Sequence, residues 1–278
     1  YVPGSVFKII TASAGIGSGA INTDTTFENQ PAEYETGFLV SGFRIHDAPR
    51  DFQRDHPLDF FEATEVSSNI WFAHAGLETG AGNLLEWAGR FGFGERIPFD
   101  LNTQPSQVTG GAGPLDGFID RVELANAAYG QGQVLVTPLQ MALVAATIAN
   151  DGLLMRPKLV DQLRSQSGAV SEVRPQAWRQ VLPTETARII GDAMQLAVEG
   201  RFGRRLAGGA KVEGVPTAGK SGTAQLGDRS DPHSWFIGYA PADSPRITIA
   251  VIVEHGGAGA QRAVPMGGDL MELYLRLE

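Results

Sequence analysis

Cysteine is missing from this chain of 278 residues, and no segment reaches the roughly 18 consecutive apolar residues that a membrane-spanning helix requires. Without cysteine the protein has no disulfide framework, no thiolate nucleophile and no cysteine-ligated metal site. Positive charge is also scarce, because 22 Lys and Arg stand against 31 Asp and Glu and the formal net charge is −9. That sign is wrong for a protein that follows a phosphate backbone, so nucleic acid is not expected as a partner.

The chain does contain enough apolar sequence for a folded core. Hydrophobic residues make up 42% and charged residues 19%, which excludes disorder as the main state, and the length suits one large domain or two ordinary ones. Helices dominate the middle of the chain and strands its end, so the predicted fold class is α+β, with a helical lobe and a sheet lobe. Apolar periodicity predicts helices at residues 6–14, 58–66, 70–77, 84–90, 119–128, 141–149, 184–198 and 266–277. Predicted strands lie at 38–40, 43–45, 158–163, 170–173, 217–224, 235–239 and 247–253, the last three as adjacent antiparallel strands.

Local signals predict where some of these elements begin and end. The three glycines at 15–19 are expected to stop the first helix. Thr137 with Gln140 predicts a capping box at the start of the helix that follows. Residues 22–57 are expected to form a loop with short strands.

Ser5 and Lys8 are the first of three short signals for chemistry. A serine hydroxyl is a weak nucleophile and needs a base within hydrogen-bond reach. A lysine three residues further along a helix lies on the same face and serves as that base when it is neutral. Burial together with a second cation, such as Lys220, is the physical route that lowers the pKa of Lys8. Taken alone, the spacing more often marks a solvated helix start.

Two more signals follow along the chain. Ser67-Ser68-Asn69, taken alone, indicates a helix break in which side chains bond to the backbone. Lys220-Ser221-Gly222-Thr223 lies on a predicted strand, where a glycine lets a substrate backbone approach, although an exposed lysine at a strand end has the same sequence. Together and in this order, the three signals match the pattern of S-x-x-K, S-x-N and K-[ST]-G around a serine nucleophile.

Longer segments surround these signals. They are Pro3-Gly4-Ser5-Val6-Phe7-Lys8, Phe91-Gly92-Phe93-Gly94, Tyr129-Gly130-Gln131-Gly132, Val136-Thr137-Pro138-Leu139-Gln140-Met141-Ala142, Ala218-Gly219-Lys220-Ser221-Gly222-Thr223-Ala224-Gln225 and Trp235-Phe236-Ile237-Gly238-Tyr239-Ala240-Pro241. On these residues the sequence resembles the transpeptidase domain of penicillin-binding proteins, most of all the monofunctional class B enzymes. The resemblance implies the penicillin-binding protein/serine β-lactamase-like fold, with an antiparallel sheet flanked by helices plus an all-helical lobe, in one transpeptidase domain over residues 1–278.

The resemblance also implies a serine acyl-transfer mechanism. Ser5 is the expected nucleophile, Lys8 takes its proton, and Ser67 relays a proton to the leaving amine. Asn69 is expected to hold Lys8 and the substrate amide. Lys220 completes the expected catalytic set.

Substrate binding is implied for the strand that carries Lys220. Lys220, Ser221 and Thr223 would bind the terminal carboxylate of the substrate or of a β-lactam, with Gly222 allowing close approach. The backbone N–H groups of Ser5 and Thr223 would form the oxyanion hole. No cofactor and no metal are expected, and the five histidines show no metal-binding spacing.

The implied activity is that of a peptidoglycan D,D-transpeptidase acylated and inhibited by β-lactams. Expected partners are stem peptides ending in D-Ala-D-Ala, β-lactam antibiotics, and other cell-wall synthesis or division proteins, at the extracytoplasmic face of the bacterial cytoplasmic membrane. A D,D-carboxypeptidase or serine β-lactamase on the same fold stays an alternative. So does a non-catalytic domain that senses β-lactams or binds partners, although the intact motif residues argue against it.

Some features depart from the family pattern. Ser221 stands where Thr is more frequent, which keeps the hydroxyl, and residues 200–205 replace a Gly-Thr turn and are expected to form a solvated loop. Glu123 is interpreted as structural rather than as a deacylating base. Because only four residues precede the expected nucleophile, we expect the leading strands of the sheet, a non-catalytic domain and a membrane anchor to belong to a segment outside this chain.

Overall fold

A computed structural model describes residues 1–48, 56–227 and 229–277, so part of the loop predicted at 22–57 lies outside the described residues. Within these ranges, no helix is long and apolar enough to cross a membrane. The helices of the body are α1 (Lys8–Ser18), α3 (Phe60–Glu65), α4 (Asn69–Arg90), α5 (Arg121–Ala128), α6 (Pro138–Ala149), α7 (Thr184–Glu199) and α8 (Ala263–Leu277). Short 3-10 turns are η1 (Gly4–Phe7), η2 (Gly203–Arg205), η3 (Gly208–Ala210) and η4 (Gly259–Gln261).

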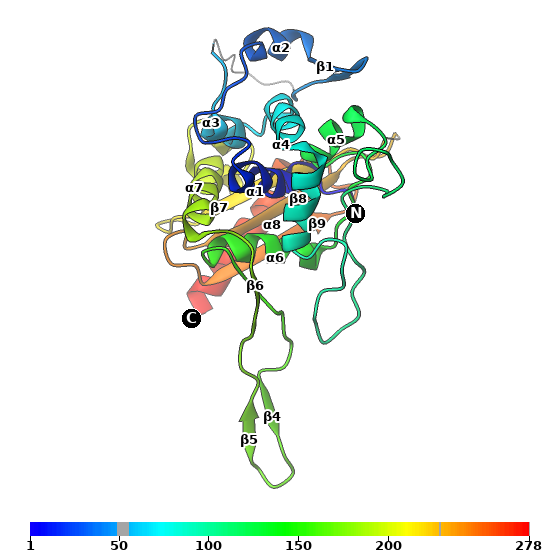
Figure 1. The fold of residues 1–278 in the computed structure, drawn as a ribbon. Coiled ribbons are helices and arrows are strands. Elements are labelled where there is room, and N and C mark those ends of the chain that lie inside the picture. Colours follow the sequence, from blue (N-terminus) through cyan, green and yellow to red (C-terminus); the bar gives the residue numbers. More distant parts are fainter. Residues whose placement is uncertain (49–55, 228, 278) are drawn as a thin grey trace.

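A three-stranded antiparallel sheet lies between helices (Figure 1). Its strands β7 (Ala218–Ala224), β8 (His233–Ala240) and β9 (Ile247–Val253) are neighbours in that order, which confirms the prediction for the end of the chain. Because side chains alternate along a strand, Trp235 and Ile237 of β8 join the large core under α1 and α6. Phe236 points to the opposite face and packs in the second core with residues of α8.

Helix α1 is longer than the sequence predicts. It continues through Gly15 and Gly17 and ends at Gly19, whose φ of 77° is left-handed. A Cβ on Gly17 would lie 2.2 Å from the ring of Trp87 in α4. The two inner glycines therefore serve close helix packing rather than termination.

Residues 30–45, between α1 and α3, form a small unit at the top of Figure 1. The predicted strands are present as the hairpin of β1 (Phe38–Val40) and β2 (Phe43–Ile45). Helix α2 (Gln30–Thr36), which begins with a proline in its first turn, was not predicted. Its seven residues make less than two turns, too short for a helical periodicity to stand out.

The capping box predicted at Thr137 forms only by half. The Thr137 hydroxyl accepts from the backbone N–H of Gln140 at 3.1 Å. The Gln140 side chain instead donates to the carbonyl of Phe91 at 2.8 Å, which ties α6 to the end of α4. Buried tertiary contact has replaced the local bond here.

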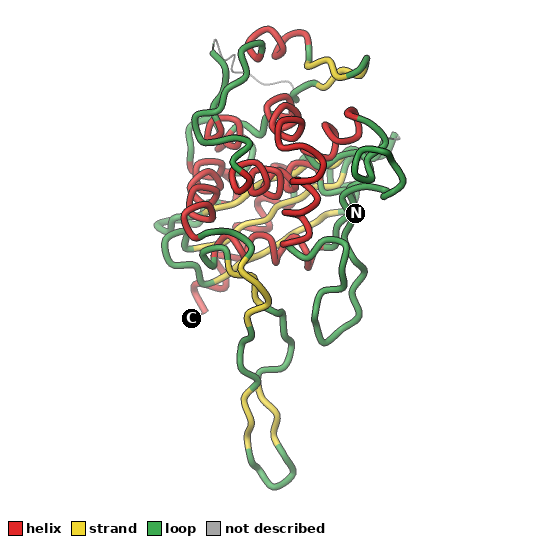
Figure 2. Tube along the Cα trace, viewed as in Figure 1, coloured by secondary structure: helices red, strands yellow, loops and turns green. Residues whose placement is uncertain are grey.

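A long excursion leaves the body between α6 and α7 (Figure 2). Strands β3 (Leu153–Met155) and β6 (Ala177–Gln180) form its base, and β4 (Gln162–Arg164) and β5 (Val170–Glu172) its tip. The strand predicted at 158–163 is therefore mostly wrong. Prolines at 157 and 175 interrupt the ladder because they have no N–H to donate.

Candidate active site

Ser5 lies in η1, the 3-10 turn that directly precedes α1. The backbone N–H of Lys8 donates to the Ser5 carbonyl, so both residues share the tight turn that the spacing predicts. Gly4 has a φ of 57°, and a Cβ there would lie 2.6 Å from the carbonyl oxygen of Thr223. Only glycine allows the turn bearing Ser5 to approach strand β7 this closely.

Lys8 is fully buried, and three oxygen atoms surround its Nζ. The Ser67 carbonyl accepts at 2.8 Å, the Ser67 hydroxyl at 3.2 Å and Asn69 Oδ1 at 2.8 Å. The ring of Phe72, one turn into α4, lies 5.4 Å from the same nitrogen. The first and second sequence signals, about 60 residues apart, thus meet at one atom.

Lys220 brings the third signal to the same place. Its side chain is 1% exposed, and its Nζ donates to Ser67 Oγ at 2.7 Å and to the Ser221 carbonyl at 3.1 Å. The Ser67 hydroxyl oxygen therefore lies within hydrogen-bond reach of both lysine nitrogens. Burial and a neighbouring cation, the two conditions set for Lys8 as a base, are both present.

The backbone at Ser67 is in the left-handed region, with a φ of 56°. For a residue with a Cβ this conformation costs about 1–2 kcal/mol. It allows the chain to turn sharply between the end of α3 and the start of α4. That turn aims both the carbonyl and the hydroxyl of Ser67 at Lys8.

Strand β7 carries the remaining predicted binding residues. Ser221 is 7% exposed, and a Cβ on Gly222 would lie 3.0 Å from the Pro3 carbonyl. The Thr223 hydroxyl accepts from the backbone N–H of Gly259 in η4 at 3.1 Å. In the sheet of the described residues β7 is an edge strand, paired with β8 on one side.

Residues that the motifs left without a role also reach this region. The Gln131 amide faces the backbone N–H and carbonyl of Gln225, each at 3.2 Å, and so links the Gly-Gln-Gly turn to the residue after β7. Burial raises the pKa of the Tyr129 hydroxyl, which bonds to Asn126. Tyr129 is therefore neutral and structural.

Segment 200–205 is more than a solvated loop. Its three arginines are exposed, as predicted, but Gly203 is buried. The carboxylate of Glu65, two residues before Ser67, accepts from the backbone N–H groups of Phe202 at 2.7 Å and Gly203 at 3.1 Å. The segment thus holds the turn that carries Ser67, a link that no local pattern could reveal.

Glu123 has local partners. Its carboxylate accepts from the N–H of Ile119 at 2.6 Å and from the Thr109 hydroxyl at 3.1 Å, which agrees with a structural role. In the described parts of the chain, no three His, Asp or Glu side chains gather where a metal ion could be held.

Comparison with known proteins places this geometry in a family. The family model described as penicillin binding protein transpeptidase domain matches residues 1–272. The chain therefore belongs to this family, and its α+β fold is the penicillin-binding protein/β-lactamase-like fold.

The more specific relatives are class B penicillin-binding proteins. Peptidoglycan D,D-transpeptidase PbpA of Mycolicibacterium smegmatis is 34% identical over 289 residues, which cover 99% of this chain and 55% of that protein. Stage V sporulation protein D of Bacillus subtilis is 32% identical over 98% of this chain and 41% of its own length. This chain thus spans about half the length of such relatives.

Solved structures agree with the sequence comparison. The imipenem acyl-enzyme complex of penicillin-binding protein A from M. tuberculosis superposes with a TM-score of 0.84 at 31% identity, covering 99% of this chain and 60% of that one. The D,D-transpeptidase domain from Eggerthella lenta gives 0.85 at 30% identity, covering 99% of this chain and 66% of that one.

Proposed function

We propose that this chain is the catalytic domain of a peptidoglycan D,D-transpeptidase. The observation that carries the proposal is the convergence of two buried lysine nitrogens on one hydroxyl, with Lys8 Nζ at 3.2 Å and Lys220 Nζ at 2.7 Å from Ser67 Oγ. Burying two lysines beside each other costs free energy that hydrogen bonds offset only in part, and such arrangements are typical of functional sites. Proton transfer around a serine nucleophile is a function that uses this arrangement.

The first step is acylation of Ser5. Its oxygen attacks the carbonyl between the two terminal D-alanines, and its proton passes to Lys8. A neutral lysine amine has two N–H bonds, which the Ser67 carbonyl and Asn69 Oδ1 accept, and its lone pair then takes the proton. Through Ser67 a proton reaches the leaving nitrogen, and D-alanine departs as the amine.

The second step transfers the acyl group. An amine of a neighbouring stem peptide attacks the ester carbonyl, gives up a proton through the same groups, and releases Ser5. Attack by water instead of an amine would make the protein a D,D-carboxypeptidase. Both outcomes pass through the same acyl-enzyme.

Strand β7 is the proposed substrate platform. An extended peptide placed along its outer edge can bond to the strand backbone. Gly222 keeps β7 close to the turn before Ser5, because a Cβ there would lie 3.0 Å from the Pro3 carbonyl and 3.0 Å from Val6. Lys220, Ser221 and Thr223 would bind the terminal carboxylate. Lys220 would supply the positive charge for it, although the chain as a whole is acidic. Because Gly4 meets Thr223 at the start of η1, the N–H groups of Ser5 and Thr223 are suited to hold an oxyanion together.

β-Lactams are proposed to acylate the same serine, since penicillin-binding protein A from M. tuberculosis forms acyl-enzyme complexes with imipenem and penicillin G. The relatives are cell-wall enzymes by name, which supports a site at the extracytoplasmic face of the membrane. Stem peptides and β-lactams are the proposed ligands, and proteins of cell-wall synthesis or division the proposed partners.

Intact-protein mass spectrometry tests the proposal. After incubation with benzylpenicillin, the wild-type chain should gain the mass of one penicilloyl group, and Ser5→Ala should gain none. An adduct that lasts many minutes supports a transpeptidase or carboxypeptidase, whereas turnover within seconds would identify a β-lactamase. A wild-type protein that takes up no penicillin would point to the non-catalytic alternative.

A further inference from the structure

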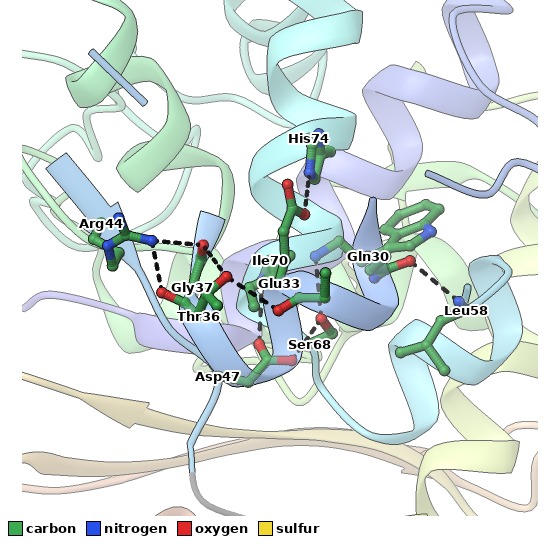
Figure 3. A network of polar contacts seen from close by, with 12 residues as sticks. Gln30, Glu33, Thr36, Gly37, Arg44, Asp47, Leu58, Ser68, Ile70 and His74 are labelled. Atoms are coloured by element: carbon green, nitrogen blue, oxygen red, sulfur yellow. Dashed lines mark hydrogen bonds and ion pairs between the residues drawn. The ribbon is translucent and has the colours of Figure 1, made fainter. Parts of the chain in front are cut away.

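The loop after β2 is hydrogen-bonded to the turn that carries Ser67 and Asn69. The carboxylate of Asp47 accepts from the Ser68 hydroxyl at 2.9 Å, from the backbone N–H of Ile70 at 3.1 Å, and from the backbone N–H of Asn69 (Figure 3). These are the first N–H groups of α4, which have no partner within the helix. Asp47 thus caps α4 from a segment about 20 residues earlier in the chain.

The same loop also orients the side chain of Asn69. The amide nitrogen of Asn69 donates to the His46 carbonyl at 3.1 Å, while its Oδ1 accepts from Lys8 at 2.8 Å. One end of the amide is held by the loop and the other by the proposed base. The carbonyl of His46 therefore selects which end of the amide faces Lys8.

The unit that supplies this loop is itself fastened to α4. His74 lies between two aromatic rings, with centroid distances of 4.6 Å to Phe27 and 3.6 Å to Phe38. Its Nε2 lies 2.7 Å from a carboxylate oxygen of Glu33 in α2. The unit thus contacts α4 at its start, through Asp47, and again one turn further on, through His74 (Figure 3).

We propose that Asp47 is a positioning residue for acylation, acting through Asn69 on Lys8. The inference rests on the proposed function, because it concerns the rate at which Ser5 is acylated. Without the carboxylate, the start of α4 loses an acceptor for three donors, and the Asn69 amide is no longer fixed opposite Lys8. A displacement of about 1 Å at a catalytic group lowers a rate by roughly a hundredfold.

The test compares Asp47→Ala and Asp47→Asn with Asp120→Ala. Asp120 caps α5 by accepting from the N–H of Glu123 at 2.9 Å, so its loss removes a similar cap elsewhere. A fluorescent penicillin provides the saturating acylation rate, the constant for non-covalent binding, and the number of adducts per chain. Thermal unfolding is followed for every variant.

Asp47→Ala is expected to acylate about 10–100 times more slowly at saturation, with non-covalent binding nearly unchanged and still one adduct per chain. Asp47→Asn keeps one acceptor oxygen and should lie between it and the wild type. Asp120→Ala should lose similar stability and keep the wild-type rate. A purely structural role would lower the number of adducts rather than the rate of the folded fraction.

A wild-type rate in Asp47→Ala would overturn the inference, as would an equal loss in Asp120→Ala. If Asp47→Ala does not fold, Asp47→Asn decides the question, and a rate equal to the wild type's would overturn the inference. Failure of the wild-type chain to take up penicillin would instead refute the proposed function, so the two failures are distinguishable.

Discussion

The site and the excursion between α6 and α7 distribute their side chains in opposite ways. In the site, the charged residues Lys8 and Lys220 are 0% and 1% exposed. In the excursion, Leu159 and, at its tip, Leu163 are both 60% exposed. Hydropathy alone would predict the reverse in both places.

The difference lies in what each group meets. The buried lysines have hydrogen-bond acceptors within 3.2 Å, which offsets part of the cost of removing a cation from water. Leu163 stays exposed because β4 and β5 pair with each other in the described structure and lie away from the body (Figure 2). Burial of charge at one place and exposure of apolar groups at the other suggest that the first region is built for chemistry and that the second contributes little to the stability of the body.

The largest expected effect is on the rate of acylation, when a lysine of the site is replaced and compared with a lysine of the excursion. Lys8→Met should lower the second-order rate constant for acylation by penicillin by about 10²–10⁴-fold, because the proposed base is removed. The control is Lys158→Met, whose ammonium pairs with Asp161 at 2.7 Å at the surface and should leave the rate unchanged. A Lys8→Met variant within tenfold of the wild type would contradict a role as base.

Much of the fold could be predicted from periodicity. Helix α7 and strand β9 match their predicted ranges within a residue. The helix carries a regular apolar pattern over more than two turns, and the strand carries one over its full length. Predictions based on single residues fared worse. The prediction that Gly17 stops α1 is wrong because Trp87, against which it packs, is 70 residues away in sequence, where no local pattern could indicate it.

The candidate site was predictable where its residues stand in motifs. Ser5 and Lys8 are neighbours on one turn, but nothing in their spacing indicates that Lys220 comes to lie beside them. Only the family pattern predicts that Lys220 lies beside Ser5 and Lys8. Asp47 and Glu65 have no such signal, because each acts on backbone N–H groups far along the chain, and any sequence can provide a backbone N–H.

The second prediction extends the comparison to packing. Ile10, two residues after Lys8 in α1, is fully buried, and Ile10→Ala should lower the free energy of unfolding by about 2–5 kcal/mol. Leu163→Ala at the tip of the excursion should change it by less than about 0.5 kcal/mol. Urea denaturation of both variants measures the difference, and equal losses would mean that the tip is covered in solution.

The third prediction concerns pH. His233 stands opposite the last residue of β7, and its Nδ1 accepts from the backbone N–H of His255. Burial lowers the pKa of His233, and the nearby charge of His255 lowers it further. Between the unfolded pKa of 6.5 and the lower folded one, the unfolded chain binds more protons, so stability is fully present above pH 6.5 and falls as the pH decreases. His233→Asn keeps an acceptor but does not titrate.

The loss of unfolding free energy from pH 7.5 to 5.5 should therefore be smaller in His233→Asn than in the wild type. Asp161 provides the comparison on the excursion. A hydrogen bond from Lys158 lowers the pKa of the Asp161 carboxyl, but this pair is exposed to solvent and contributes little. Asp161→Asn should leave the pH dependence of the unfolding free energy unchanged. A change as large as that of His233→Asn would show that titration of His233 is not the source of this pH dependence.

Only a small effect is expected even when the tip of the excursion is removed altogether. Replacing residues 157–175 by Asn-Gly would connect Arg156 to Gln176, whose backbones already bond at 2.9 Å, and would keep the base where Trp178 packs against Gly92. The deletion loses the bond from the Leu159 N–H to Asp100 at 2.8 Å. Because an isolated two-stranded hairpin is marginally stable by itself, unfolding should change by less than about 1 kcal/mol and penicillin acylation by less than about twofold. A loss of acylation without a loss of stability would instead connect the excursion to the site, and the division between the two regions would fail.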